Sequence, residues 1–110
     1  MTTDERKVTL LGETATVPED ERFYFAEYDD GSYGLQFDNG TQEVEIWASD
    51  GPTINDYRAE QILPYACEAA IVHFMEKANW QFYLTNDSTL KAYDNAQVWM
   101  RILEKVRGRT

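Results

Sequence analysis

The chain has 110 residues, of which 43% are hydrophobic and 14% aromatic, and its formal net charge is −10. This length predicts a single domain over residues 1–110, and this composition excludes an intrinsically disordered chain. No apolar run approaches the length of a membrane span, and the first residues contain no apolar signal-peptide core. A single cysteine, Cys67, cannot form an internal disulfide, so we expect a soluble, cytoplasmic protein that does not associate with membranes.

The negative charge is concentrated in one half of the chain. Residues 1–56 contain 14 acidic and 3 basic side chains, a net charge of −11. Residues 57–110 contain 6 acidic and 7 basic side chains, a net charge of +1. Halophilic adaptation would spread acidic residues over the whole surface, and the near-neutral C-terminal half argues against it. Such asymmetry points to a partner that binds through electrostatics.

The acidic half has the composition of β-strands. Residues 7–17 are rich in β-branched side chains and predict a first strand, interrupted at Gly12. An acidic turn at residues 18–21 leads into residues 22–47, which contain the turn signals Asp30-Gly31 and Asn39-Gly40. These signals predict two successive β-hairpins, and the Ser-Asp-Gly-Pro sequence at residues 49–52 ends the β-rich half.

The second hairpin has a register that the sequence predicts. With Asn39 and Gly40 as the central residues of a type I′ turn, Leu35 is expected opposite Val44. Alternation along both strands then produces a half-buried antiparallel sheet with one apolar and one acidic face. The apolar face would carry Tyr33, Leu35, Val44 and Ile46, and the outer face Gln36, Asp38, Glu43, Glu45 and Trp47.

The first hairpin leaves two registers open. A two-residue turn at Asp30-Gly31 pairs Ala26 with Leu35 and places Phe23 and Phe25 on the outer face. The core side of that strand would then carry Tyr24, Ala26 and Tyr28. A slip of one residue, or a bulge, exchanges the two faces. The alternative is therefore that Phe23 and Phe25 face the core or are covered by another segment.

The C-terminal half has the periodicity of α-helices. Thr53 and Asp56 match a capping box, which predicts a short helix from Ile54 to about Leu63, and Pro64 should kink or restart it. Beyond Pro64, apolar residues recur at spacings of three and four, typical of a helix lying on a sheet. This stripe consists of Leu63, Ala66, Cys67, Ala70, Ile71, Phe74 and Ala78.

Two further segments complete the helical half. Residues 80–84 either prolong the main helix or form a fifth strand. A last helix within residues 89–107 has a basic end, which suits the negative end of the helix dipole. Its expected buried residues are Ala96, Met100, Leu103 and Val106, and its basic end includes Arg101, Lys105 and Arg107.

Together these elements predict an α+β fold. We expect one N-terminal antiparallel sheet of three to five strands, built from hairpins and packed on one face by C-terminal α-helices. The β-rich acidic half would span residues 7–49, and the helical half residues 53–107. Both halves would belong to the single domain of residues 1–110.

No residue pattern indicates catalysis. His73, the only histidine, lies six residues after Cys67, about 240° around a helix, so the two cannot form a dyad along it. Acidic turns such as Asp29-Asp30-Gly31 lack the ligand spacing of a calcium loop and are explained as hairpin turns. We therefore expect a non-enzymatic protein with no catalytic residue, no metal and no cofactor.

The acidic residues of the hairpins form the expected binding site. Carboxylates on the outer face and at the hairpin tips would meet the partner, and exposed aromatic residues would anchor it. The expected partner-binding residues are Asp29, Asp30, Asp38, Glu43, Glu45, Trp47 and Asp50. An acidic flank would consist of Glu19, Asp20, Glu21 and Glu27, and Phe23 and Phe25 would join the anchor in the first register.

The chemistry of this face favours a basic partner. Alternate residues on a strand lie about 6.8 Å apart, comparable to two 3.4 Å rises along a DNA strand, so carboxylates can imitate phosphates. In size, charge and compartment the chain is similar to phage-encoded DNA mimics, which inhibit restriction enzymes, CRISPR effectors or other nucleases. This implies a basic, nucleic-acid-binding protein as partner and no direct contact with nucleic acid.

Two other functions remain open. An immunity protein that neutralises a basic toxin, such as a secreted nuclease, would present the same acidic face. A small enzyme or ligand-binding domain would carry its acidity incidentally and place its pocket between sheet and helices.

Overall fold

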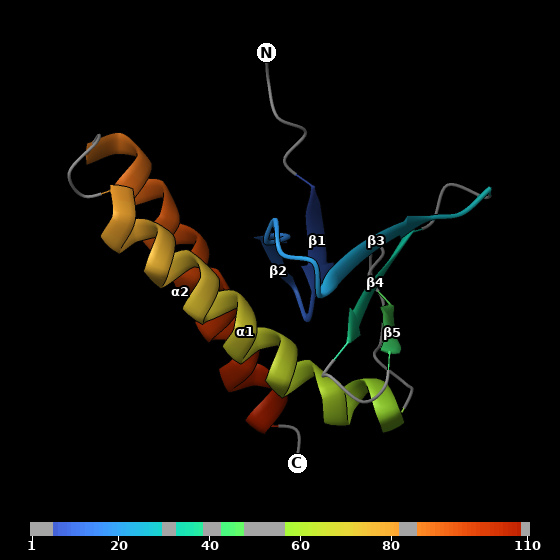
Figure 1. Ribbon diagram of the computed structural model, residues 1–110. Coiled ribbons are helices and arrows are strands. Elements are labelled where there is room, and N and C mark those ends of the chain that lie inside the picture. Colours follow the sequence, from blue (N-terminus) through green and yellow to red (C-terminus); the bar gives the residue numbers. More distant parts are fainter. Residues whose placement is uncertain (1–5, 30–32, 39–42, 48–56, 82–85, 109–110) are drawn as a thin grey trace.

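A computed structural model describes residues 6–29, 33–38, 43–47, 57–81 and 86–108. Five strands come first and two long helices follow, with the helices lying side by side on one side of the strands (Figure 1). The α+β class with C-terminal helices is therefore confirmed. The capping box at Thr53 and Asp56 and the helix start at Ile54 lie outside the described residues.

The described strands form two antiparallel sheets, so the expected single sheet is wrong. Strands β1 (Lys7–Leu10) and β2 (Glu13–Thr16) pair with each other, and β3 (Phe23–Glu27), β4 (Tyr33–Asp38) and β5 (Glu43–Trp47) form the second sheet. Between β2 and β3 the chain passes Pro18, which has no N–H to donate, and turns where Phe23 N donates to Asp20 O. The residues between β2 and β3 thus separate the two sheets, and β2 does not pair with β3.

The first sheet is a hairpin where one interrupted strand was expected. Leu11 and Gly12 connect β1 to β2 and have φ angles of 51° and 82°, so both central residues are left-handed, as in a type I′ turn. Gly12 adopts this conformation without a steric penalty, whereas for Leu11 it costs about 1–2 kcal/mol. Contacts of this turn with the last helix, described below, offset that cost.

The β4–β5 hairpin has the expected faces but a different register. Leu35 pairs with Ile46 and Phe37 with Val44, so the strands are joined by four residues and not by two. The expected pairing of Leu35 with Val44 is therefore wrong by two positions. Because side chains alternate with a period of two, this shift leaves each residue on its predicted face. The apolar face is confirmed at Leu35, Val44 and Ile46, which are all buried.

The β3–β4 hairpin has the alternative of the two registers. Phe25 pairs with Leu35 and Phe23 with Phe37, one position away from the pairing of Ala26 with Leu35. This slip exchanges the faces of β3, so that Phe23 is only 8% exposed and Tyr24 is 60% exposed. Phe23 packs against Phe37 with a ring-centroid distance of 4.9 Å. The placement of Phe23 on the outer face is therefore wrong.

The helices α1 (Tyr57–Gln81) and α2 (Asn86–Gly108) pack along each other, and α1 contacts β5 while α2 contacts β2. Helix α1 continues through Pro64, so the expected restart does not occur there. Buried neighbours on the same turns, Leu63 and Cys67, hold this region against the core and offset the hydrogen bond that proline removes. Of the residues 80–84, the first two are helical and the others lie outside the described residues.

The buried stripe of α1 is as predicted, with Ile71 only partly buried, and in α2 the predictions for Ala96, Leu103 and Val106 are confirmed while that for Met100 is wrong. Met100 was expected in the core and is 40% exposed, whereas Trp99 is fully buried. Its indole N–H donates to the Thr16 carbonyl oxygen at 2.9 Å, and its ring lies 6.2 Å from that of Phe23. Trp99 thereby joins α2 to both sheets. The buried residues of α2 are Ala92, Ala96, Trp99, Ile102, Leu103 and Val106.

Candidate protein-binding face

The outer face of the β3–β4–β5 sheet is the side opposite its buried residues. Strand alternation places Tyr24 and Ala26 of β3 and Gln36 and Asp38 of β4 on this face. The positions of Glu43, Glu45 and Trp47 alternate with buried Val44 and Ile46 and so belong to the same face. We refer to these residues together as the outer sheet face.

The register brings some of the expected site residues together. Asp38 lies directly opposite Glu43, and Gln36 lies opposite Glu45. Three acidic positions therefore lie toward the end of the sheet at which β4 connects to β5. Trp47 lies opposite Gly34, toward the other end. The side chains of Glu43, Glu45 and Trp47, together with Asp30 and Asp50, lie outside the described residues.

Asp29 is separated from this group. It is exposed and follows β3, where the β3–β4 hairpin projects away from the helices (Figure 1). Asp38 is at the opposite end of β4, a strand of six residues that spans about 17 Å. The expected site is therefore an extended acidic track with carboxylates near both ends of the sheet, and not one compact patch.

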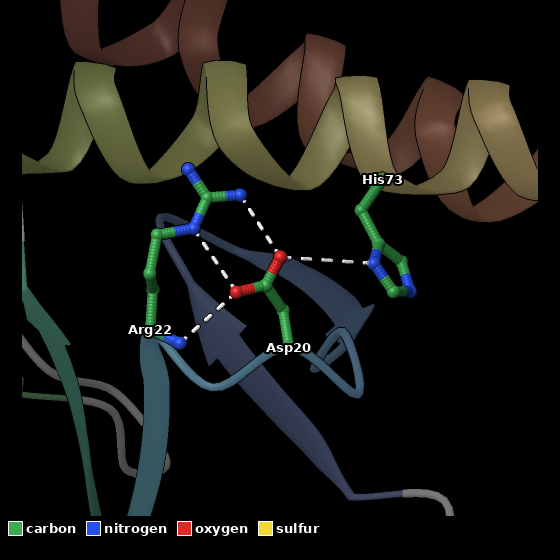
Figure 2. Close-up of polar contacts among 3 residues, drawn as sticks. All are labelled: Asp20, Arg22 and His73. Carbon is green, nitrogen blue, oxygen red and sulfur yellow. Dashed lines mark hydrogen bonds and ion pairs between the residues drawn. The ribbon is translucent and has the colours of Figure 1, made fainter.

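Two acids of the expected flank are held by arginines. Asp20 accepts hydrogen bonds from the Arg22 backbone N and Nε on Oδ1, both at 3.0 Å, and from Nη2 on Oδ2 at 2.9 Å (Figure 2). The hydrogen bonds from the Arg22 side chain lower the pKa of Asp20 to about 2. Glu27 lies 3.7 Å from Arg6, whose guanidinium also lies over the Phe25 ring. Glu19 and Glu21 are exposed.

A third cluster joins the two halves of the chain. Glu13 accepts hydrogen bonds of 2.8 Å from Arg101 Nε and from Lys105 Nζ, and these bonds lower its pKa, that from Arg101 most. Lys105 Nζ also donates to the Leu11 carbonyl oxygen at 2.9 Å, which holds the left-handed turn against α2. The basic end of α2 therefore binds acids of this chain, as does Arg107, which lies 3.2 Å from Glu68 of α1.

The two potentially reactive residues of α1, Cys67 and His73, lie in different environments. Burial raises the pKa of the Cys67 thiol to about 12, so the thiol stays protonated near neutral pH. His73 Nδ1 lies 3.9 Å from Asp20 Oδ2, beyond hydrogen-bond distance, and burial lowers its pKa despite the opposing effect of Asp20 (Figure 2). Within the described residues, no group of three or more potential metal ligands occurs.

Comparison with protein families, with characterised proteins and with solved structures gives no match. In the described part of the chain, neither helix combines the length and the apolar character needed to cross a bilayer. What the chain does must therefore be inferred from its own residues.

The residue of this face that sequence reasoning missed is Tyr24. Its side chain is 60% exposed, whereas a two-residue turn at Asp30-Gly31 would have placed it in the core. One signal could have identified it, because the two phenylalanines on either side of Tyr24 are the more apolar pair. Their burial requires Tyr24 to point outward.

The Asp20–Arg22 pair predicts a specific dependence of stability on pH. Because the folded-state pKa of Asp20 is about 2, against an ordinary value of 3.8, its contribution is present above about pH 4 and is lost toward pH 2. Asp20→Asn should cost about 1 kcal/mol at neutral pH, a value discounted because Arg22 is half-exposed and only two residues away. Urea unfolding from pH 2 to pH 7 measures both effects.

The control for this experiment is Glu21→Gln, which neutralises an exposed neighbour without removing the pair. The difference in the free energy of unfolding between wild type and Asp20→Asn should become smaller as the pH falls from 4 to 2. Glu21→Gln should have the same pH dependence as the wild type. A constant difference across this range would show that Asp20 titrates normally in the folded protein.

Proposed function

We propose that the chain is a non-enzymatic binding protein whose acidic half engages the basic, nucleic-acid-binding surface of another protein, as a DNA mimic does. The observation that carries this proposal is the net charge of −11 in residues 1–56, which exceeds the charge that solubility requires of a small domain. Of the three bases in this half, Arg6 and Arg22 are paired with acids of their own half. Two of the three bases of this half are therefore already engaged within the fold.

The ion pairs separate the acids that pair within the fold from those that the proposal assigns to a partner. Glu13 and Asp20 serve the fold, since cations hold both of their carboxylates at hydrogen-bond distance. Glu19, Glu21 and Asp29 are exposed, and within the described chain no ion pair joins them to a cation. A surface of one sign steers an oppositely charged protein toward it and accelerates association.

The geometry of the sheet supports mimicry of a phosphate track. Positions 43 and 45 are about 6.8 Å apart along β5, and Asp38 lies opposite position 43 on the neighbouring strand, about 5 Å away. Acidic positions therefore occur in two adjacent columns at spacings near those of successive phosphates. A surface that binds nucleic acid through lysine and arginine would meet this arrangement with complementary charge.

The test is a double charge reversal, Glu43→Lys with Glu45→Lys, against a matched control, Glu76→Lys with Glu104→Lys, which changes the net charge equally on exposed helix positions. The partner is first captured from lysate at low salt and identified, and its affinity is then measured between about 50 and 300 mM NaCl. The strand variant should bind about tenfold or more weakly, with a flatter salt dependence, while the helix variant should retain both. Nucleic acid should compete with the wild-type chain.

Circular dichroism and the thermal midpoint confirm that both variants fold. Equal losses in the two variants would show that only net charge matters and that the outer sheet face is not the site. Loss of binding on substitution of Arg101 or Lys105, with no effect of the strand variant, would indicate an acidic partner instead.

A further inference from the structure

The outer sheet face contains an aromatic residue that its fold does not require. The Tyr24 side chain is 60% exposed, whereas Phe23 before it is buried and packs against Phe37 and Trp99. Tyr24 lies in the row Tyr24–Gln36–Glu45 that crosses all three strands. Aromatic side chains at the centre of an interface commonly supply its binding energy, while charges at the rim steer association.

The same strand already binds one guanidinium group. Arg6 lies over the Phe25 ring, 5.1 Å from its centroid, and its Nη1 is 3.7 Å from Glu27 Oε1. An aromatic ring and a carboxylate two residues apart on β3 thus hold an arginine between a π-face and a negative charge. This is the arrangement that favours arginine over lysine, because the planar guanidinium stacks on a ring while it pairs with an acid.

The opposite face of β3 offers Tyr24 the same combination. Asp38 is its diagonal neighbour on β4, about 7 Å away, and position 45 is two strands away, about 10 Å. The cation next to Tyr24 in the sequence, Arg22 just before β3, is engaged elsewhere, because its side chain extends toward α1 and is held there by Asp20 (Figure 2). A cation arriving from solvent therefore meets an exposed ring in a negative environment.

We propose that Tyr24 is the stacking platform for an arginine side chain of the basic partner. This inference rests on the proposed function and specifies it, because it assigns the recognised group as a guanidinium and the recognising residue as Tyr24. Lysine would bind the same face through charge alone. The face therefore selects arginine-rich surfaces among the basic proteins that its charge attracts.

The experiment uses oligoarginine and oligolysine peptides of equal length as probes. Their affinities are measured by fluorescence anisotropy at low ionic strength. The wild-type chain should bind the arginine peptide about two- to fivefold more tightly than the lysine peptide, as expected for an exposed cation–π contact. Tyr24→Ser should abolish this preference and leave the lysine affinity unchanged, whereas Tyr24→Phe should retain it. The ring NMR signals of Tyr24 should shift with the arginine peptide only.

The matched control is Tyr65→Ser, because Tyr65 is 59% exposed on α1 and lies outside the outer sheet face. It should leave the arginine preference intact. If Tyr24→Ser keeps the preference while Glu43→Lys with Glu45→Lys still weakens both peptides, the platform is wrong and the acidic binding face stands. If the double charge reversal weakens neither peptide, the proposed function fails and this inference fails with it.

Discussion

Trp99→Ala should destabilise the protein by about 3–5 kcal/mol, the largest effect that we expect of any single substitution. Trp99 is the largest fully buried side chain of the described residues, and its removal leaves a cavity between α2 and both sheets. It also removes the partly buried hydrogen bond from the indole N–H to the Thr16 carbonyl oxygen. Urea unfolding followed by circular dichroism measures the change in the free energy of unfolding.

Two further variants separate the contributions. Trp99→Phe keeps an aromatic ring and loses the indole N–H, so its cost should be smaller, about 1–3 kcal/mol. Met100→Ala changes the adjacent, half-exposed residue and should cost about 1 kcal/mol or less. A larger cost for Met100→Ala than for Trp99→Ala would mean that α2 packs through the face that its sequence alone predicts.

Helix α2 shows why periodicity could not decide between Trp99 and Met100 as the buried residue. Residues 98–100 are Val-Trp-Met, three apolar side chains in succession, so a period of 3.6 residues allows either Trp99 or Met100 to be buried with Ala96 and Leu103. The choice depends on partners far away in the chain. Thr16 accepts the indole hydrogen bond and Phe23 packs against the ring, and neither is visible from the local sequence of the helix.

The sheets show which strand properties depend on turn geometry. Asn39-Gly40 predicted a two-residue turn, but four residues connect β4 and β5. The predicted pairing is wrong by two positions, and because side chains alternate with a period of two, each residue still lies on its predicted face. In the β3–β4 hairpin the two open registers differ by one position, an odd shift that exchanges the faces of β3, and the structure has the register with Phe23 in the core. The Phe-Tyr-Phe-Ala sequence of this strand has aromatic residues on both faces in either register, so alternation alone left both open.

The negative charge of the acidic half was predictable from the sequence, but the ion pairs that neutralise some of its acids were only partly predictable. Asp20 and Arg22 are two residues apart, and a pair between them is visible in the sequence. Glu13 meets Arg101 and Lys105 only because the β1–β2 hairpin folds against α2, whereas the sequence alone relates those bases to the helix dipole. Ion pairs between distant elements thus decide which acids serve the fold and which can serve a partner.

Phe23→Ala should cost about 3–4 kcal/mol of stability, whereas Tyr24→Ala should cost less than about 1 kcal/mol. Phe23 lies in the core beside Phe37 and Trp99, and the exposed Tyr24 side chain has no comparable packing to lose. Both substitutions replace an aromatic residue of the same strand by Ala, so their similar losses of β-propensity contribute little to the difference between them. Urea midpoints and m-values of both variants measure this difference.

The order of the two effects tests the register of β3 directly. In the other register, with Ala26 opposite Leu35, Tyr24 would be a core residue and Phe23 an exposed one, and the order of the two costs would reverse. In the register of the structure, Tyr24→Ala should instead leave the fold intact and weaken partner binding. Any loss of binding by Phe23→Ala should follow from its loss of stability. Affinity measured at a temperature where both variants are folded separates these effects. A stability cost of Tyr24→Ala above that of Phe23→Ala would place Tyr24 in the core and remove it from the proposed binding face.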